Sequence, residues 1–231
     1  LTEVKVNRIE IASARVSKGE FECASKIIQW AKESDFLDKI EILGFLDKHI
    51  SIDWVNNAGG KYINLLCKGS LRQLEGQLRK TPDEHIADIK ENLAYAESLG
   101  ISVNVYLEDW SNGMRNSQDY VFYMLDNLQN TSIKRFMLPD TLGILYPKET
   151  YKYCKQIRER YPNLHFDFHG HNDYGLAVAN STAALTAGFN GIHTSVNGLG
   201  ERAGNTALST IVPCIHDHLH METTVQEITL D

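Results

Sequence analysis

Cysteine is scarce in this sequence, and its placement excludes two common uses of the residue. Only four cysteines occur among 231 residues, and they lie far apart, at Cys23, Cys67, Cys154 and Cys214. No two of them form a Cys-x-x-Cys pair, so the pattern indicates neither a disulfide framework nor a cysteine-based zinc or redox motif. We expect reduced, mostly buried thiols in a cytoplasmic protein.

The sequence also lacks an excess of positive charge and a long apolar run. Its formal net charge is -7, which argues against general binding to nucleic acid or to anionic membranes, although a local basic patch still suits an anionic cofactor. We find no signal-peptide pattern and no apolar run of bilayer-spanning length. The composition, 42% hydrophobic and 23% charged, is typical of a globular protein with one sizeable core.

No linker, low-complexity tract or change in composition divides the chain, so we predict one catalytic domain over residues 1–231 and no regulatory domain. Short β-like runs alternate with amphipathic helical stretches, which is typical of a parallel sheet. The predicted strands are residues 8–12, 39–45, 62–67, 101–108, 133–138, 165–169 and 191–196. The predicted helices are residues 18–33, 47–58, 71–98, 117–130, 147–160, 174–188 and 204–219.

Two features favour a (β/α)8 TIM barrel over a doubly wound sheet. Strand residues such as Asn104, Tyr106 and Glu108 put polar groups on one face, whereas a sheet covered by helices on both faces reads as continuous apolar runs. Candidate chemical residues also stand at the C-terminal ends of strands, where barrel enzymes place their sites. We count seven βα units, and such a barrel needs eight. Because the chain begins with Leu1 just before a strand, we predict an α/β barrel whose first strand is missing.

The most informative stretch is His169-x-His171 at the end of a predicted strand. Alternate side chains of an extended chain point to the same side, so the two histidines share one face, while Phe166 and Phe168 share the other. A His-x-His pair at a strand end can supply two ligands to a divalent metal. The alternative is a pair of hydrogen-bonded histidines in a polar barrel interior, which is the role we expect for His193.

Several ordered segments resemble one enzyme family. Residues 138–143 read LPDTLG, residues 169–181 read HGHNDYGLAVANS and residues 197–205 read NGLGERAGN. They resemble the signature of the aldolase-like barrel synthases and lyases, which include 2-isopropylmalate synthase, homocitrate synthase, citramalate synthase and hydroxymethylglutaryl-CoA lyase. Residues 8–15 (RIEIASAR) and 105–113 (VYLEDWSNG) are most similar to the citramalate synthases. The resemblance runs the whole length of the chain and implies a metal-dependent acyltransferase.

The resemblance implies a divalent metal, zinc, manganese or magnesium, held by His169 and His171, with Asn205 as a further ligand or a neighbour of the ligands. Such a metal acts as a Lewis acid on the ketone and carboxylate oxygens of a 2-oxo acid. The family's remaining ligand is an aspartate in an Arg-Asp-Gly-Glu-Gln run, whose arginine would stabilise a developing oxyanion. This sequence lacks that run. A truncated chain explains its absence better than an inactive remnant does, because every other segment is intact.

The resemblance also implies acid–base and substrate-binding residues. Tyr106 and Glu108 share one strand face, where Tyr106 is expected to line the substrate pocket. Glu108 is expected to remove a proton from the acetyl methyl group, directly or through water. The alternative for Glu108 is a structural carboxylate paired with Arg15 or Lys68. Thr141 is expected to hydrogen-bond the substrate carboxylate, unless it is only a helix-cap or turn residue.

Leu43 and Leu66 face the same way as Tyr106 by strand alternation. In the citramalate synthases that this chain resembles, apolar groups at such positions form a small wall against the pyruvate methyl, whereas 2-oxoglutarate needs a polar or cationic partner. We therefore expect (R)-citramalate formation from pyruvate and acetyl-CoA, a step toward isoleucine. The alternative functions are a 2-isopropylmalate synthase, which uses 2-oxoisovalerate in leucine biosynthesis, a lyase, and an inactive barrel. The alternative role of Leu43 and Leu66 is ordinary packing in the core. One methylene group of difference between two substrates changes their relative transition-state binding free energy by only about 1–3 kcal/mol.

The acyl donor follows from the glycine-rich loop at residues 198–205. The lyase branch carries a cysteine in this loop, and the present sequence has none there, which favours a synthase that condenses acetyl-CoA and then hydrolyses the thioester. Lys68 and Arg72 flank a predicted helix start, where free N–H groups favour the phosphates of CoA. Such a pair is more often solvated surface. The family is commonly dimeric, so we also expect a homodimer.

Overall fold

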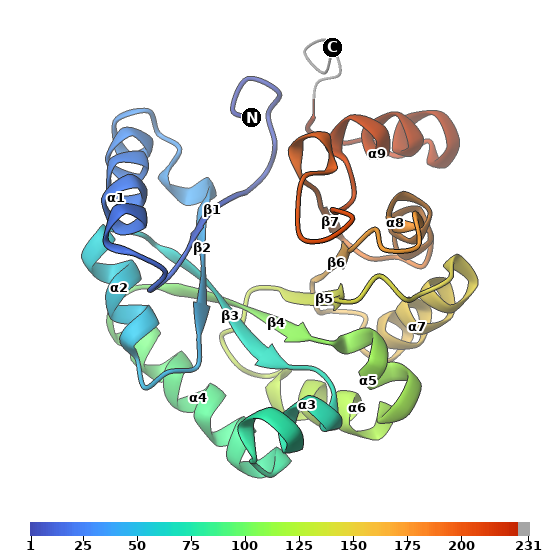
Figure 1. Cartoon of the computed structure of the whole chain (residues 1–231), viewed down its shortest axis with the longest axis horizontal. Helices are drawn as coiled ribbons and strands as arrows, with labels where there is room; N and C mark the ends of the chain where they lie inside the picture. The colour runs from blue at the N-terminus through green and yellow to red at the C-terminus, as the bar shows by residue number, and fades with distance from the viewer. Residues whose placement is uncertain (226–231) are drawn as a thin grey trace.

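The computed structural model describes residues 1–225 of the chain. Within that range, seven parallel strands follow one another in the sheet in the order β1 to β7, and helices connect them. The sheet curls around a central interior, and the helices lie on its outer side (Figure 1). This arrangement confirms the predicted α/β barrel fold, with seven of the eight strands that a full barrel has.

Each strand leads toward the same end of the barrel before the chain turns back through helical segments. The strands are β1 (Ile9–Ser13), β2 (Ile40–Phe45), β3 (Tyr62–Lys68), β4 (Ser102–Glu108), β5 (Phe136–Asp140), β6 (Phe166–Gly170) and β7 (Gly191–His193). The α-helices are α1 (Lys18–Glu33), α2 (Ile50–Ala58), α3 (Leu71–Gln73), α4 (Pro82–Ser98), α5 (Trp110–Asn116), α6 (Gln118–Leu128), α7 (Pro147–Arg160), α8 (Ala177–Thr186) and α9 (Leu208–Cys214). Between them lie the 3-10 turns η1 (Leu37–Lys39) and η3 (Val196–Gly198) and the π turns η2 (Leu74–Leu78) and η4 (Ile215–Leu219).

Local capping chemistry explains where the longer helices begin. The hydroxyl of Ser17 accepts a hydrogen bond from the N–H of Glu20 at the start of α1, over 3.0 Å. Thr81 and Glu84 cap α4 reciprocally, with Pro82 in the first turn, and both features are strong start signals. Because these signals are local, the predicted ranges 18–33 and 147–160 agree with α1 and α7.

The two faces of the sheet differ in chemistry. Phe166 and Phe168 of β6 are fully buried in the apolar cluster between the sheet and the helices. The alternate residues of the same strand, Asp167 and His169, point into the interior, where they contact polar and aromatic groups of other strands. Burying one phenylalanine side chain stabilises a fold by about 1.5–3 kcal/mol. The outer face therefore supplies hydrophobic stability, and the interior carries the polar groups.

The segment before β1 lies against the other end of the curled sheet. Val6 packs on a second apolar cluster, formed by residues of α8, α9 and η4. The hydroxyl of Thr224 donates a hydrogen bond to the carbonyl of Lys5 over 2.9 Å. In the described residues β1 is not hydrogen-bonded to β7, so side-chain packing and isolated hydrogen bonds join the two ends of the sheet.

Several predicted elements have different bounds in the structure. The predicted helix 71–98 is divided into α3, η2 and α4, because Arg79 adopts a left-handed backbone conformation with φ of 55° and Pro82 begins a new helix. The predicted strand 191–196 ends at His193, since the N–H of Ser195 bonds instead to the carbonyl of Thr206 over 3.0 Å. The first difference thus has a local cause in the backbone near Arg79, and the second is a hydrogen bond to the chain after β7.

Two expectations from composition can be compared with the structure. All four cysteines are free thiols, as expected. Cys67 and Cys154 are buried, which raises the pKa of both thiols, whereas Cys23 is exposed and Cys214 is half-buried. The expectation of mostly buried thiols is thus correct for two of the four. Within residues 1–225 no helix is both long and apolar enough to cross a membrane.

Candidate functional site

The two histidines of the His-x-His motif converge at the C-terminal end of β6. His169 is the fourth residue of that strand, and His171 follows its last residue and bridges to Asn205 on the chain after β7. The Nε2 atoms of the two imidazoles lie 3.3 Å apart. His169 also stands edge-on to the ring of Tyr106, with 6.1 Å between ring centroids. The structure therefore brings together the three residues that the sequence predicted as metal donors.

The electrostatic environment keeps these imidazoles neutral. Burial lowers the pKa of His169 well below its ordinary value. Burial also lowers the pKa of His171, with a second contribution from Arg202. A neutral imidazole carries the lone pair that a metal ligand needs, so the protonation state of both side chains suits ligation.

Three buried polar atoms at this place lack a partner in the described part of the chain. They are Nδ1 of His169, Nδ1 of His171 and Oδ1 of Asn205. Unpaired buried polar atoms are rare in proteins and call for an explanation such as a bound ion. Two imidazoles and an amide oxygen fit part of the coordination shell of a divalent cation. Residues 1–225 offer no cluster of three or more His, Cys, Asp or Glu side chains for a metal, so no carboxylate joins the two histidines in such a cluster there.

Tyr106 and Glu108 both face the interior from β4, but they have different partners. Tyr106 is 7% exposed, and burial raises the pKa of its phenol well above the ordinary value. Its Oη lies 2.9 Å from Nδ1 of His193. Glu108 forms an ion pair with Nζ of Lys68, and its side chain is 22% exposed. Of the two partners considered for Glu108 from the sequence, Lys68 is the one observed, whereas Arg15 pairs with another carboxylate.

Thr141 follows β5 and is held from two sides. Its Oγ1 accepts a hydrogen bond from the N–H of Asp109 over 2.8 Å, and its carbonyl accepts one from Nη2 of Arg202 over 2.9 Å. The turn itself is capped by Asp140, whose carboxylate accepts from two backbone N–H groups. Asp140 is thus the cap residue, whereas Thr141 lies in the turn that follows β5, so the turn half of that alternative describes its place in the chain. The hydroxyl proton of Thr141 is left to donate to a ligand.

Leu43 and Leu66 lie on the inward face of β2 and β3. Leu43 stands opposite Asn64 in the sheet register, and Leu66 stands opposite Tyr106. Both leucines are half-buried, and neither belongs to the apolar clusters that the described residues form between sheet and helices. Their position agrees with the predicted apolar wall of an interior pocket and argues against ordinary core packing.

The predicted phosphate site at Lys68 and Arg72 is only partly supported. Lys68 is engaged with Glu108. The helix after Ser70 is a single turn, Leu71–Gln73, before the π turn, so it lacks the macrodipole of a long helix. Arg72 is exposed and lines a groove of about 720 Å³ together with Asn112 and Asn116 of α5. The structure thus corrects the helix-start argument and leaves Arg72 beside an open groove.

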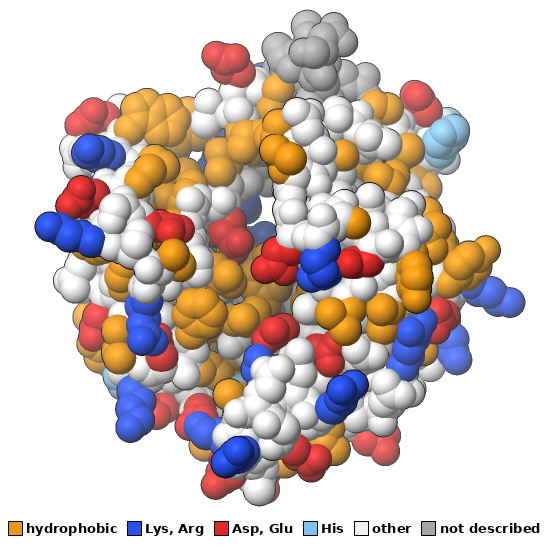
Figure 2. Space-filling model, in the orientation of Figure 1, with side chains coloured by type: hydrophobic (Ala, Val, Ile, Leu, Met, Phe, Trp, Pro, Cys, Tyr) orange, Lys and Arg blue, Asp and Glu red, His pale blue; other side chains and the backbone are white. Residues whose placement is uncertain are grey.

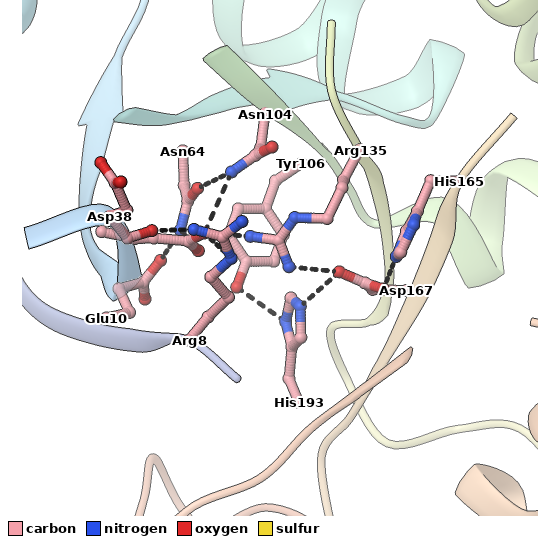
Figure 3. A network of polar contacts seen from close by, with 11 residues as sticks. Arg8, Glu10, Asp38, Asn64, Asn104, Tyr106, Arg135, His165, Asp167 and His193 are labelled. Carbon is pink, nitrogen blue, oxygen red and sulfur yellow. Dashed lines mark hydrogen bonds and ion pairs between the residues drawn. The ribbon is translucent and has the colours of Figure 1, made fainter. Parts of the chain in front are cut away.

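A network of charged groups in the interior was not predicted from the sequence. We call Glu10, Glu41, Asn64, Asn104, Arg135 and Asp167 the lower network, because they stand near the starts of their strands (Figure 3). Arg135 donates to Glu41 and, over 2.8 Å, to Asp167. The only sequence signal for Glu41 and Arg135 is a charge inside an apolar strand.

The interior opens to one face of the molecule. Figure 2 shows that this face is hollowed at its centre, and that acidic and basic side chains surround the hollow. Polar groups on the inner sides of several parallel strands, and candidate ligands at their C-terminal ends, are the arrangement that barrel enzymes use. Fold and site together define the class of protein as an α/β barrel with an interior site at the C-terminal ends of the strands.

Comparison with known proteins narrows this class to one family. The chain belongs to the HMGL-like family, whose model matches residues 1–230. The sequence is 33% identical over 227 residues to a homocitrate synthase of Saccharolobus islandicus, and that match covers 96% of this chain and 47% of the relative. A homocitrate synthase of Sulfurisphaera tokodaii is 34% identical over 225 residues, with the same coverage. The chain therefore spans about half the length of these relatives.

Solved structures agree on the fold. The HMG-CoA lyase of Bacillus subtilis superposes with a TM-score of 0.76 at 18% identity, covering 99% of this chain and 79% of that one. The hydroxymethylglutaryl-CoA lyase of Pseudomonas aeruginosa gives a TM-score of 0.73 at 18% identity, covering 100% and 79%. At this level of identity the likeness establishes the barrel architecture alone.

Proposed function

We propose that this chain forms the catalytic barrel of an acyltransferase that condenses acetyl-CoA with a 2-oxo acid. The observation that carries the proposal is the convergence of His169 and His171 beside Asn205 at the C-terminal end of β6. Membership of the HMGL-like family and relatives named homocitrate synthase support the reaction class. Homodimer formation stays a prediction.

His169, His171 and Asn205 would hold a divalent cation, zinc, manganese or magnesium, through neutral imidazole nitrogens and an amide oxygen. When bound, the cation would supply Lewis-acid polarisation of the ketone of the 2-oxo acid. The Nε2 atoms of the two imidazoles, which face one another over 3.3 Å, and the unpaired Oδ1 of Asn205 support this assignment. Thr141 would donate its hydroxyl proton to the carboxylate of the 2-oxo acid, since its oxygen already accepts from the backbone of Asp109.

Glu108 is our proposed acceptor for the proton that leaves the acetyl methyl group. It lies inward on β4, two residues beyond Tyr106, and its partial exposure lets a substrate reach the carboxylate. Lys68 holds that carboxylate in place. We expect Glu108→Gln to lower kcat by about 10²–10⁴-fold, because a positioned base contributes about that much, while KM for the 2-oxo acid changes little. Full activity of the variant would exclude Glu108 as the base.

The acceptor substrate that we propose is pyruvate, which would give (R)-citramalate. Leu43 and Leu66 support a small apolar pocket, because both are inward-facing and half-buried. The test is release of CoA from acetyl-CoA in the presence of pyruvate, 2-oxoisovalerate or 2-oxoglutarate. A preference for 2-oxoisovalerate would instead indicate a 2-isopropylmalate synthase, and acetoacetate formation from hydroxymethylglutaryl-CoA would indicate a lyase.

Homocitrate formation is a second candidate, and one observation favours it. The relatives reported above are named homocitrate synthases, which would make 2-oxoglutarate the acceptor. Activity of the wild type with pyruvate and with 2-oxoglutarate separates the two candidates, and substitution of the apolar wall tests whether the wall limits the size of the acceptor. Leu66→Ala should increase the use of 2-oxoisovalerate relative to pyruvate, by about one to two powers of ten in kcat/KM if the wall limits size. A wild-type preference for 2-oxoglutarate would contradict the pyruvate proposal.

For the acyl donor, we propose that the CoA moiety lies over the groove beside Arg72. The groove carries asparagine side chains that can bond to the amide groups of pantetheine, and Arg72 supplies one positive charge at its edge. Because Lys68 is paired with Glu108, we assign to Arg72 the larger part of any phosphate contact.

A further inference from the structure

Three side chains form a chain of contacts across the barrel interior. Tyr106 of β4 places its Oη 2.9 Å from Nδ1 of His193 in β7. The other ring nitrogen of His193, Nε2, lies 3.4 Å from Oδ2 of Asp167 in β6. Figure 3 shows the imidazole between the phenol and the carboxylate. Each side chain comes from a different strand, and the curl of the sheet brings β4 opposite β7 across the interior (Figure 1).

Asp167 is an ionised carboxylate at the end of this chain of contacts. The side chain of Asp167 is 3% exposed, and its carboxylate is the ion-pair partner of the guanidinium of Arg135. Nη1 of Arg135 donates to Oδ2 over 2.8 Å, and Nε2 of His165 lies 2.9 Å from Oδ1. An ionised carboxylate only accepts hydrogen bonds. The proton of the contact with His193 therefore sits on Nε2 of that imidazole.

The tautomer of His193 in turn determines the direction of the next hydrogen bond. A neutral imidazole that carries its proton on Nε2 has only a lone pair on Nδ1. Nδ1 must then accept, so the hydroxyl of Tyr106 donates to it. The phenol keeps its proton near neutral pH, since the ordinary pKa of a tyrosine is about 10. The oxygen of Tyr106 therefore presents a lone pair to the interior beside His169.

We propose that Asp167 and His193 are positioning residues that turn the hydroxyl proton of Tyr106 away from His169, so that Tyr106 offers a hydrogen-bond acceptor to an O–H group of the bound substrate. Condensation with a 2-oxo acid converts a ketone into a hydroxyl, which is the O–H donor that such an acceptor fits. This identification of the donor rests on the proposed function. The orientation of Tyr106 rests on the contacts alone.

The direct test is the tautomer of His193 in the full chain, which needs no substrate. Long-range ¹H–¹⁵N correlation spectra at about pH 8, where a free imidazole is neutral, distinguish protonated from unprotonated ring nitrogens. The signals of His193 are assigned by their loss in His193→Gln. We expect a protonated Nε2 and an unprotonated Nδ1. A protonated Nδ1, alone or together with Nε2, would overturn the proposal.

A pair of variants tests whether Asp167 sets this tautomer. In Asp167→Asn the new amide can donate to Nε2, so the proton of His193 should move to Nδ1, as replacing the carboxylate of a catalytic triad gives the wrong tautomer. His165→Gln is the matched control, because it removes another partner of Asp167 that does not contact Tyr106. We expect it to leave the tautomer unchanged. An unchanged tautomer in Asp167→Asn would contradict the role of Asp167.

The link to activity is tested by a double-mutant cycle. We expect Asp167→Asn to lower kcat by roughly 10- to 100-fold while KM for the 2-oxo acid changes less than about threefold, because the contact matters once the hydroxyl has formed. If Asp167 acts through Tyr106, the same substitution should have almost no further effect in a Tyr106→Phe background. Additive losses would overturn the proposed action through Tyr106. Failure of the proposed function would show as no CoA release in the wild type, and the tautomer measurement is independent of it.

Discussion

The lower network and the cluster of His169, His171 and Asn205, here called the upper site, occupy the same barrel interior but differ in how their titratable groups are paired. In the lower network the unpaired buried atom is an amide oxygen, Oδ1 of Asn104. Every charged group of the lower network has a partner, from Glu10 with Asn64 to Arg135 with Glu41 and Asp167. The upper site holds buried ring nitrogens and an amide oxygen without one. Buried polar groups are usually satisfied, so the difference separates a structural layer from a place prepared for a ligand.

His193 links the lower network to the upper site. It stands between the two layers, with Asp167 of the lower network on one side and Tyr106, which contacts His169, on the other. A side chain in this position allows the lower network to determine how a hydroxyl group is oriented beside the upper site. The variants below act on the lower network, on the upper site, on a buried histidine outside the interior and on the edge of the site, so that the loss each one causes can be compared.

The largest effect is expected from breaking the lower network at Arg135. Arg135→Met leaves the carboxylates of Glu41 and Asp167, which are 4% and 3% exposed, without their shared cation. Removing one partner of a buried ion pair costs about 3–5 kcal/mol, which urea unfolding would measure. Lys18→Met is the control, because its pair with Glu22 is exposed and contributes less than about 1 kcal/mol. Equal effects of the two variants would show that the lower network is not a structural layer.

At the upper site we expect a smaller effect, which is specific to metal binding. His169→Ala should weaken binding of zinc or manganese at least about 100-fold, which corresponds to about 2.7 kcal/mol, because one of two imidazole donors is lost. Isothermal titration calorimetry measures this directly. His218→Ala in the exposed part of η4 should bind the metal as the wild type does. Equal affinity of both variants would place the metal, if it binds, outside the upper site.

A buried histidine outside the barrel interior makes the stability of the fold depend on pH. His85 of α4 is fully buried, its Nε2 accepts from the N–H of Lys68, and burial lowers its pKa to about 4. The unfolded chain, with a histidine pKa of about 6.5, takes up a proton first, so stability falls as the pH drops from 6.5 toward 4. We expect a loss of about 2 kcal/mol in the free energy of unfolding between pH 7 and 5 from this group.

His85→Gln checks this assignment, because a glutamine can accept the same hydrogen bond and does not titrate. The difference in stability between wild type and variant should change by about 2 kcal/mol over that pH range. A constant difference would mean that His85 does not contribute to the acid sensitivity of the fold.

The smallest effect is expected at the edge of the site. Arg72→Ala should raise KM for acetyl-CoA by about two- to fivefold, because an exposed charge contributes about 0.2–1 kcal/mol, and the effect should shrink as salt is added. Lys26→Ala on α1, also exposed, should leave KM unchanged. A large effect of Arg72→Ala that salt does not reduce would indicate a buried contact instead.

Much of the barrel was predictable because its signals are local. The alternation of Phe166, Asp167, Phe168 and His169 predicts a strand with one apolar and one polar face, and the structure confirms both. The predicted helices 18–33 and 147–160 agree with α1 and α7 for the same reason, because amphipathic periodicity is a local signal. The predicted helix 71–98 was wrong in its middle, where a left-handed Arg79 interrupts a pattern that still looks helical.

The candidate site was predictable only in part. The motif around His169 and His171 locates a pair of donors, and the spacing of Tyr106 and Glu108 places both on one face. The partners of these residues come from other strands. Lys68 and Glu108 are 40 positions apart, and Glu41 and Arg135 are 94 apart, so no local pattern reports the contact.

The sequence by itself determined the alternation of strands and helices, the polar inner face of β4 and β6, and the family to which the chain belongs. These follow from side-chain periodicity and from motifs a few residues long. Only the tertiary structure decided that Glu108 pairs with Lys68, that Asn205 lies beside His171, and that His193 joins Tyr106 to Asp167. The physical reason is that a parallel barrel brings together residues from strands that are separated by whole helices, and the register between those strands is a property of the folded sheet.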